Sequence, residues 1–223
     1  NGWVRAAKGH DIDGTALGYK SGDAFCSQAS GQSRQMSVFL DSTGRAYALP
    51  AHSLPSARSH GEPLTGRLNP PAGSSFCQVL MGQPTDKVLL ASSAGYGFIT
   101  QLENLYSKNK AGKTSISLPA GSAVLTPVNV ESEQWVMVVT SEPRMLVFTM
   151  DELPELAKGK GNKLISIPPA KLKSGEESVV SVVALPEDAK LVVHAGKKYK
   201  VLQGEALKEH LGERGRRGKL LPK

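Results

Sequence analysis

The sequence is poor in aromatic side chains, in cysteine and in long apolar runs. Aromatic residues make up 5% of the 223 residues, and the only cysteines are Cys26 and Cys77. A secreted disulfide scaffold normally contains more cysteines, and a structural zinc site needs about four ligands. The apolar runs are too short to cross a bilayer. These shortages exclude a disulfide-rich secreted domain, a zinc-stabilised fold and a helical membrane protein, and they favour a reducing cytoplasm.

Sequence patterns of catalytic sites are missing as well. Neither G-x-S-x-G nor H-E-x-x-H occurs. Gly112-Lys113-Thr114 resembles the end of a phosphate-binding P-loop, but that motif needs a glycine where Ser107 stands. We therefore expect no enzyme activity, no metal site and no cofactor in this chain, and a propeller hydrolase has no motif in its favour.

Glycine and proline, by contrast, are frequent, with 23 and 14 residues. Together with many short apolar runs they predict an all-β protein with many turns. Trp3 and Trp135 fall within expected strands and are predicted to be core residues. The chain starts inside an expected strand and shows no signal-peptide pattern, so we interpret it as an excised fragment of a longer protein.

Three markers recur along the chain at a spacing close to 50 residues. The first is a glycine-led turn, at 22–26, 73–77 and 121–125, and the second is a strand–turn–strand segment, at 38–49, 89–100, 138–148 and 191–201. The third is a leucine followed by a basic, glycine-containing loop; the leucines are Leu54, Leu105, Leu153 and Leu207. Repeats of this length with several short strands indicate a propeller or a related radial array, with a solenoid as the alternative.

The repeats predict one domain over 1–223, a five-bladed β-pinwheel or propeller-like disc whose ring is either closed or open. The expected blades are approximately 1–31, 32–81, 82–130, 131–187 and 188–223, the first and last being incomplete. Cys26 and Cys77 then belong to different repeats, so no disulfide between them is predicted.

The basic loops are the candidate functional feature, because radial repetition would place equivalent loops around one perimeter. Lysine and arginine neutralise phosphates, and glycine lets backbone N–H groups approach them. The residues expected to contact DNA are Lys8 and His10 in the first unit, Arg58 in the second, Lys108, Lys110 and Lys113 in the third, Lys158, Lys160 and Lys163 in the fourth, and Arg214, Arg216, Arg217 and Lys219 in the fifth.

The total charge is a weaker signal than the recurrence of these loops. The formal net charge is +7, and residues 190–223 alone carry ten basic residues against three glutamates. The expected contact is with the phosphate backbone of a bent duplex and does not depend on base sequence. If about six phosphates are neutralised, affinity should fall roughly a thousandfold between 50 and 200 mM salt.

The hairpin-plus-basic-loop unit resembles the repeat of the C-terminal domains of the A subunits of gyrase and topoisomerase IV. The resemblance covers essentially the whole chain, and the segments that carry it are 2–14, 41–45, 54–66, 94–98, 158–163 and 212–218. In gyrase, the first blade has a Gln-Arg-Arg-Gly-Gly-Lys-Gly-type box needed for chiral wrapping of DNA. Ala7-Lys8-Gly9-His10 stands there in this sequence, and there are five units against the usual six. Both departures make topoisomerase IV the closer match.

The resemblance implies a pinwheel whose blades exchange a strand and whose rim binds and bends the transported duplex, tuning decatenation and supercoil relaxation. It implies that the DNA-cleaving tyrosine, the metal site and the ATPase lie outside this fragment, and that the holoenzyme uses ATP and magnesium. The implied partners are double-stranded DNA, the catalytic core of the same polypeptide and the ATPase partner within a heterotetramer. The isolated domain is expected to be monomeric. The implied location is the cytoplasmic nucleoid, with peripheral inner-membrane association of the holoenzyme as a further option.

A protein-interaction propeller is the alternative function. Its basic loops would dock an acidic partner such as a chromosome condensin, a role that the same resemblance allows. Salt-dependent binding to duplex DNA separates the DNA-binding function from this alternative.

Overall fold

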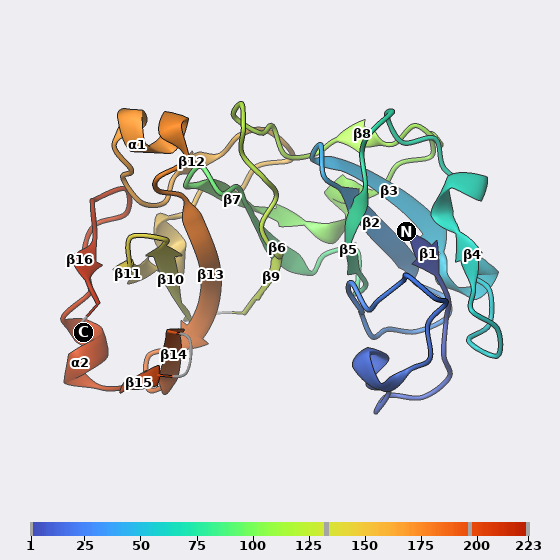
Figure 1. Cartoon of the computed structure of the whole chain (residues 1–223), viewed down its shortest axis with the longest axis horizontal. Coiled ribbons are helices and arrows are strands. Elements are labelled where there is room, and N and C mark those ends of the chain that lie inside the picture. The colour runs from blue at the N-terminus through green and yellow to red at the C-terminus, as the bar shows by residue number, and fades with distance from the viewer. Residues whose placement is uncertain (1, 132–133, 196–197, 222–223) are drawn as a thin grey trace. The chain divides into compact units, whose positions relative to one another are not determined.

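The computed structural model describes residues 2–131, 134–195 and 198–221. The chain forms two compact units. The first contains Asn1–Asp86, Gln101–Ser117 and Ala157–Gly159, and the second contains Lys87–Thr100, Leu118–Leu156 and Lys160–Lys223. Strands dominate both units, which confirms the all-β prediction (Figure 1).

Among the described residues, the first unit contains two sheets. Its larger sheet has the strand order β5-β2-β3-β8, and its smaller sheet pairs β1 with β4. The strands are β1 (Trp3–Val4), β2 (Met36–Asp41), β3 (Arg45–Pro50), β4 (Glu62–Pro63), β5 (Phe76–Leu80) and β8 (Lys113–Thr114). Short 3-10 turns connect them: η1 (Gly14–Ala16), η2 (Ala51–Ser53), η3 (Leu64–Gly66) and η4 (Leu102–Leu105).

The described part of the second unit contains three sheets, with the strand orders β12-β7-β6-β9, β13-β10-β11-β16 and β14-β15. The strands are β6 (Lys87–Ala91), β7 (Tyr96–Gln101), β9 (Val128–Val130), β10 (Gln134–Thr140), β11 (Arg144–Thr149), β12 (Asn162–Lys163), β13 (Val179–Pro186), β14 (Leu191–Ala195), β15 (Lys198–Leu202) and β16 (Lys219–Leu220). The last residue of β7, Gln101, belongs to the first unit. The helical elements are η5 (Met150–Glu152), α1 (Pro169–Ser174) and α2 (Glu205–Lys208). No helix of the described ranges has the length and hydropathy needed to cross a bilayer.

The four-stranded sheets share one plan. A hairpin forms the centre, β2–β3, β6–β7 or β10–β11, and the next strand of the chain pairs with its first strand. A two-residue strand that follows the basic loop of the next repeat pairs with its second strand: β8 on β3, β12 on β7 and β16 on β11. Each of these sheets therefore takes its fourth strand from the following repeat, as the resemblance implied.

A serine at each hairpin turn fixes the following outer strand. The Oγ atoms of Ser42, Ser93 and Ser141 accept hydrogen bonds from the backbone N–H groups of residues 75, 123 and 178. The backbone N–H of each serine in turn donates to the carbonyl oxygen of the same residue. These paired bonds satisfy backbone groups at the sheet end, where the ladder stops.

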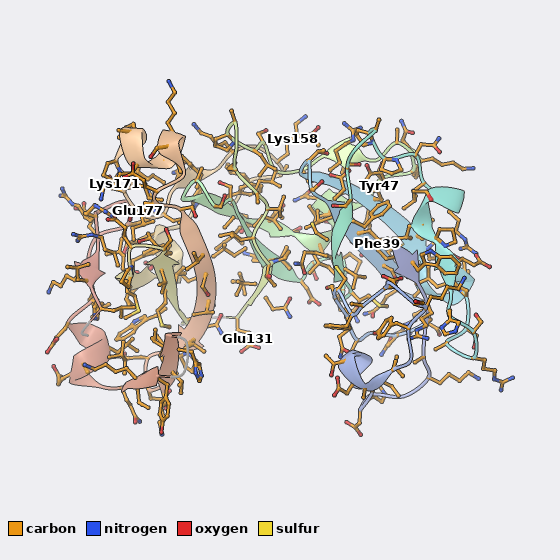
Figure 2. All side chains as sticks on the ribbon, viewed as in Figure 1. Phe39, Tyr47, Glu131, Lys158, Lys171 and Glu177 are labelled. Carbon is orange, nitrogen blue, oxygen red and sulfur yellow. The ribbon has the colours of Figure 1, made fainter. Side chains whose placement is uncertain are left out.

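Apolar side chains fill the space inside each unit. In the first unit Phe39, Tyr47, Leu64 and Leu68 form a buried cluster, and Figure 2 labels Phe39 and Tyr47 on the central hairpin. In the second unit one cluster lies around Phe148 and Leu164, and another around Trp135, Met137 and Leu207. Trp135 is a core residue as predicted.

Trp3 is not a core residue, so that prediction was wrong. Its side chain is exposed, and the Nζ atom of Lys20 lies 3.6 Å from its ring centroid. β1 pairs only with the two-residue strand β4 among the described strands. Little sheet therefore covers the tryptophan, and a cation–π contact takes the place of burial.

Candidate nucleic-acid interface

Four glycines hold the basic loops against strands of the preceding repeats. They occupy the same position in each loop, one residue before the short strand that docks: Gly61, Gly112, Gly161 and Gly218. All four have positive φ angles, between 63° and 86°. A Cβ atom on any of them would lie within 2.8 Å of a backbone carbonyl oxygen, that of Val4, Ala46, Gly97 or Met145 respectively. Only glycine combines this conformation with so close an approach.

These glycines therefore have a packing role that differs from the one expected from the sequence. We expected glycine to bring backbone N–H groups close to phosphates. At these four positions the close neighbour is a strand of the preceding repeat. The glycine closes the loop onto that strand, and the basic residues before it are held at the edge of a sheet.

Arginines on the hairpins tighten the same contact from the other side. The Nε atom of Arg45 donates to the carbonyl oxygen of Ala111 at 2.9 Å, and its Nη2 atom donates to that of Gly112 at 3.0 Å. Arg144, at the equivalent place on β11, donates to the carbonyl oxygen of Gly218 at 3.2 Å. Sequence reasoning missed this role, although the recurrence of arginine at the start of the second hairpin strand was a visible signal.

The candidate residues of the second and third loops lie mainly at the surface of the first unit. Arg58, Lys108 and Lys110 are exposed, while Lys113 is half-buried on β8. Burial lowers the pKa of Lys113, and the nearby Lys158 ammonium lowers it further. Two cations that approach each other in this way favour an anion between or beside them.

The fourth loop divides between the two units. In the first unit, Gly159 donates to the carbonyl oxygen of Ser115 at 3.1 Å and accepts from the N–H of Ser117 at 2.9 Å, which holds the neighbouring Lys158 (Figure 2). In the second unit the Nζ atom of Lys160 lies 4.4 Å from the ring centroid of Tyr96. The three lysines of this loop, Lys158, Lys160 and Lys163, are all exposed.

Most of the candidate cations lack an acidic partner. Within the described part of the chain, no ion pair involves Lys8, Arg58, Lys108, Lys110, Lys113, Lys158, Lys160, Lys163 or Lys219. No carboxylate of the described ranges neutralises their charge, and an external anion can reach those that are exposed. No group of three or more possible metal ligands occurs in this part of the chain.

The fifth loop uses two of its arginines inside the second unit. Arg214 donates from Nε to the carbonyl oxygen of Glu152 and from Nη1 to that of Lys163, at 2.8 and 2.7 Å. Arg217 binds both carboxylate oxygens of the fully buried Glu177, at 2.7 and 2.6 Å. The sequence showed only two more basic residues in a glycine loop and gave no sign of these internal partners.

A small charge network surrounds the Arg217–Glu177 pair. Arg217 also lies 3.3 Å from a carboxylate oxygen of Glu142, and that carboxylate pairs with Lys171 of α1. The Lys171 ammonium lowers the pKa of Glu142, with Arg217 adding to the effect. Figure 2 shows Lys171 and Glu177 close together near α1. The network joins the β10–β11 turn, α1 and the fifth loop, so these side chains hold the fold together.

Arg216 and Lys219 remain at the surface of the fifth loop. Arg216 is exposed and forms an ion pair with Glu213 at 2.7 Å, and Lys219 is exposed on β16. A surface pair of this kind contributes little and can exchange its partner for a phosphate.

The first loop differs in position from the others. Lys8 and His10 follow directly after β1 and the single bridge at Ala6, whereas the other basic loops come after a 3-10 turn or a short helix and dock on a preceding strand. Both side chains are exposed. The sequence predicted that this loop is equivalent to the other four, and that prediction was wrong. The same sequence pattern, a glycine close to basic residues, occurs in the first loop and in the others, so the pattern alone does not distinguish them.

Comparison with known proteins agrees with this architecture. A family model described as "DNA gyrase C-terminal domain, beta-propeller" matches residues 86–131 and 134–186. The solved structure of the E. coli ParC C-terminal domain is 46% identical, covers 99% of this chain and 90% of that chain, and has a TM-score of 0.91. The A subunit of DNA topoisomerase 4 is 53% identical in Pseudomonas aeruginosa and 49% identical in Haemophilus influenzae, each over 100% of this chain. The chain belongs to the topoisomerase IV family, as a C-terminal domain of the A subunit.

This chain spans 30% of the length of the two curated relatives. A solved structure titled as a DNA gyrase A C-terminal domain shares the fold, with a TM-score of 0.66 at 14% identity. The β-propeller fold and the assignment to topoisomerase IV, both expected from the sequence, are therefore confirmed.

Proposed function

We propose that this chain is the DNA-binding accessory domain of a type IIA topoisomerase, and that its docked basic loops contact the phosphate backbone of a duplex. The observation that carries the proposal is that most of the candidate cations have no acidic partner among the described residues and lie in loops that a glycine fixes to a sheet edge. Membership in the topoisomerase IV family supports it. The contacting residues that the geometry favours are Lys108, Lys110, Lys158, Lys160, Lys163, Arg216 and Lys219, with Lys8, His10, Arg58 and Lys113 in supporting places.

Arg214 and Arg217 have a different part in this proposal. Their guanidinium groups already bind protein carbonyls and carboxylates. They position the fifth loop, and phosphate contact falls to Arg216 and Lys219 beside them. Removing Arg217 would therefore weaken DNA binding through loss of structure, not through loss of a phosphate contact.

In the parent protein, the domain would bind and bend the transported duplex and so tune decatenation and relaxation. We place DNA cleavage, ATP hydrolysis and their magnesium ions in the remaining parts of the polypeptide and in its ATPase partner. No cofactor is proposed for this chain, and the proposed location is the cytoplasmic nucleoid.

Fluorescence anisotropy with a labelled duplex tests the proposal. We expect log affinity to fall linearly with log salt, with a slope of about −0.9 for each phosphate contacted. The double variant Lys108→Ala/Lys110→Ala should weaken binding and make the slope shallower by the amount that corresponds to about two phosphate contacts. Lys173→Ala is the matched control, because Lys173 is an exposed lysine of α1 outside the loops. A flat salt response, or equal effects of loop and control variants, would contradict the proposal.

Docking of an acidic protein, such as a chromosome condensin, is the second candidate function. One observation favours it: the β14–β15 hairpin exposes Val192, Tyr199 and Val201 beside the exposed Lys200. Val192→Ser/Tyr199→Ser should abolish such docking and leave duplex affinity unchanged. Loss of duplex binding in this variant would instead assign the hairpin to the DNA surface.

A further inference from the structure

The two cysteines of the chain lie in adjacent segments of the first unit, although the repeat pattern assigned them to different blades. Cys26 is exposed, and its Sγ atom lies 3.5 Å from the carbonyl oxygen of Cys77. Both are free thiols in this structure. Membership in different repeats has therefore not kept the two residues apart.

The segment around Cys26 runs along the edge of β5. Ser27 donates from Oγ to Oε1 of Gln78 and accepts from the backbone N–H of Val79, both at 3.3 Å. Residues 23–32 have no regular secondary structure. Side-chain contacts therefore hold this segment against β5, and residues 23–32 form no sheet ladder that would restrain their movement toward Cys77.

Cys77 lies at an irregular point of β5. Asp41 pairs with Phe76 and Leu40 pairs with Gln78, so Cys77 is the extra residue of a β-bulge. Its Sγ atom donates to the carbonyl oxygen of Leu40 at 3.4 Å, and the residue is half-buried. A bulge bends the strand and re-aims the extra side chain. An exposed thiol thus lies beside a sheltered one.

We propose that Cys26 and Cys77 form a peroxide-sensitive thiol pair, which closes to a reversible disulfide that staples the segment 23–32 to β5. Nothing in the proposed DNA-binding function requires this pair, and the two proposals stand independently. A transient disulfide of this kind fits the redox-sensing role that is usual for disulfides in reducing compartments.

The chemistry proceeds in two balanced steps. The exposed Cys26 thiolate attacks one oxygen of hydrogen peroxide, the O–O bond breaks, and hydroxide leaves, which gives a sulfenic acid at Cys26. The Cys77 thiolate then attacks the Cys26 sulfur, the S–O bond breaks, and the second hydroxide leaves. Two thiols lose two electrons in total, one peroxide is reduced, and two water molecules form once both hydroxides take up protons. A small thiol such as dithiothreitol reverses the reaction by exchange.

The second step should be slow at neutral pH and faster at alkaline pH. Burial raises the pKa of the Cys77 thiol to about 11, and the negative charges of a Cys26 thiolate and of the Asp41 carboxylate add to the effect. Oxidation of Cys26 to the neutral sulfenic acid removes only the contribution of the Cys26 charge. The disulfide should therefore form faster at pH 9 than at pH 7.

The test treats the 223-residue chain with hydrogen peroxide, blocks free thiols and records intact mass and tryptic peptides. We expect loss of both free thiols with a mass decrease of about 2 Da. We also expect one cross-linked product joining the peptide 21–34 to the peptide 68–87, and its disappearance on reduction. Thermal unfolding should shift upward by several degrees in the oxidised chain and return on reduction, because the bond closes a long loop.

Three variants separate a built pair from chance reactivity. Cys77→Ser should stop at sulfenic acid or go on to sulfinic acid at Cys26, and Cys26→Ser should leave Cys77 unmodified. The matched control, Cys26→Ser/Ser30→Cys, keeps an exposed thiol on the same segment but away from Cys77, and it should cross-link far more slowly. The proposal is wrong if wild type yields only sulfinic acid or intermolecular dimers, or if the control variant cross-links as fast as wild type.

Discussion

Arg217 shows that a charge within a basic loop can serve the fold. Its guanidinium forms two hydrogen bonds with Glu177, a carboxylate with no solvent exposure, and a further contact with Glu142. Buried, bidentate pairs of this kind cost much to break, because the remaining charge stays buried without a partner. The neighbouring Arg216 has a solvent-exposed pair instead.

Arg217→Ala should therefore destabilise the protein by about 3–5 kcal/mol. The adjacent Arg216→Ala should change stability by less than about 0.5 kcal/mol. Urea unfolding followed by circular dichroism measures both. Similar losses of unfolding free energy in the two variants would mean that the Arg217–Glu177 pair does not stabilise the fold more than the exposed pair does.

His210 gives the stability of the second unit a specific pH dependence. Its side chain is buried, and its Nδ1 atom has no hydrogen-bond partner among the described residues. Burial lowers the pKa of His210, and the Lys219 ammonium lowers it further, against opposite effects from the Met145 backbone and Glu209. The unfolded chain therefore protonates this imidazole at a higher pH than the folded chain does.

The contribution of neutral His210 to the free energy of unfolding is fully present above a pH of about 6.5, the usual pKa of histidine. It is lost as the pH falls toward the pKa of His210 in the folded chain. The slope cannot exceed about 1.4 kcal/mol per pH unit for one group. Urea midpoints between pH 7.5 and 5.5 should decline less steeply in His210→Gln than in wild type. His52→Gln, which changes an exposed histidine of η2, should keep the wild-type slope.

At the scale of elements, the recurring event is the docking of a short strand onto the hairpin of the preceding repeat. Gly112 has a φ of 63°, and a Cβ atom there would lie 2.6 Å from the Tyr47 ring and 2.7 Å from the Ala46 carbonyl oxygen. Both neighbours belong to β3, a central strand, and both are buried. Neither can move without disturbing the sheet.

Gly112→Ala should therefore destabilise the first unit by more than about 1 kcal/mol. Gly66→Ala is the control within the same unit, because its φ is not in the left-handed region and a Cβ atom there meets nothing within 4 Å. Hydrogen exchange at the backbone N–H groups of Ser115 and Ile116, which bond to Gly44, should report local opening. Unchanged exchange in Gly112→Ala would show that the glycine is not needed for docking.

At the scale of the whole molecule, charge matters through its placement. The net charge of +7 equals the sum over the last 34 residues, yet Lys108 and Lys110 lie outside that segment and have no acidic partner among the described residues. Contacts with the phosphate backbone of DNA carry no information about the base sequence. The loops should therefore act alike on every duplex.

Lys108→Ala/Lys110→Ala should weaken binding to an A·T-rich and a G·C-rich duplex by the same factor within error. Competition anisotropy at one fixed salt concentration compares the two. Lys87→Ala is the control, because Lys87 already pairs with Glu155 at 2.7 Å. A loss confined to one duplex would indicate groove readout by these loops.

The repeat, the strand–turn–strand units, the all-β class and the family are all encoded locally and could be predicted from the amino-acid sequence. They follow from patterns such as apolar runs bounded by glycine and serine, which act over a few residues and recur visibly. The exposed loop lysines were also identifiable, because lysine side chains mostly lie at the protein surface. The blade boundaries over 1–223 remain a prediction.

Which charges face solvent and which segments meet depend instead on tertiary structure. Arg217 and Arg216 are neighbours in one basic run, but only the first finds a buried carboxylate, contributed by Glu177 forty residues away. Cys26 and Cys77 are 51 residues apart and become adjacent when one segment packs on the edge of β5. Such contacts depend on how distant elements pair, and no local pattern encodes them. The physical reason is that burial and electrostatic pairing are properties of the packed molecule, whereas turn and strand preferences belong to the chain itself.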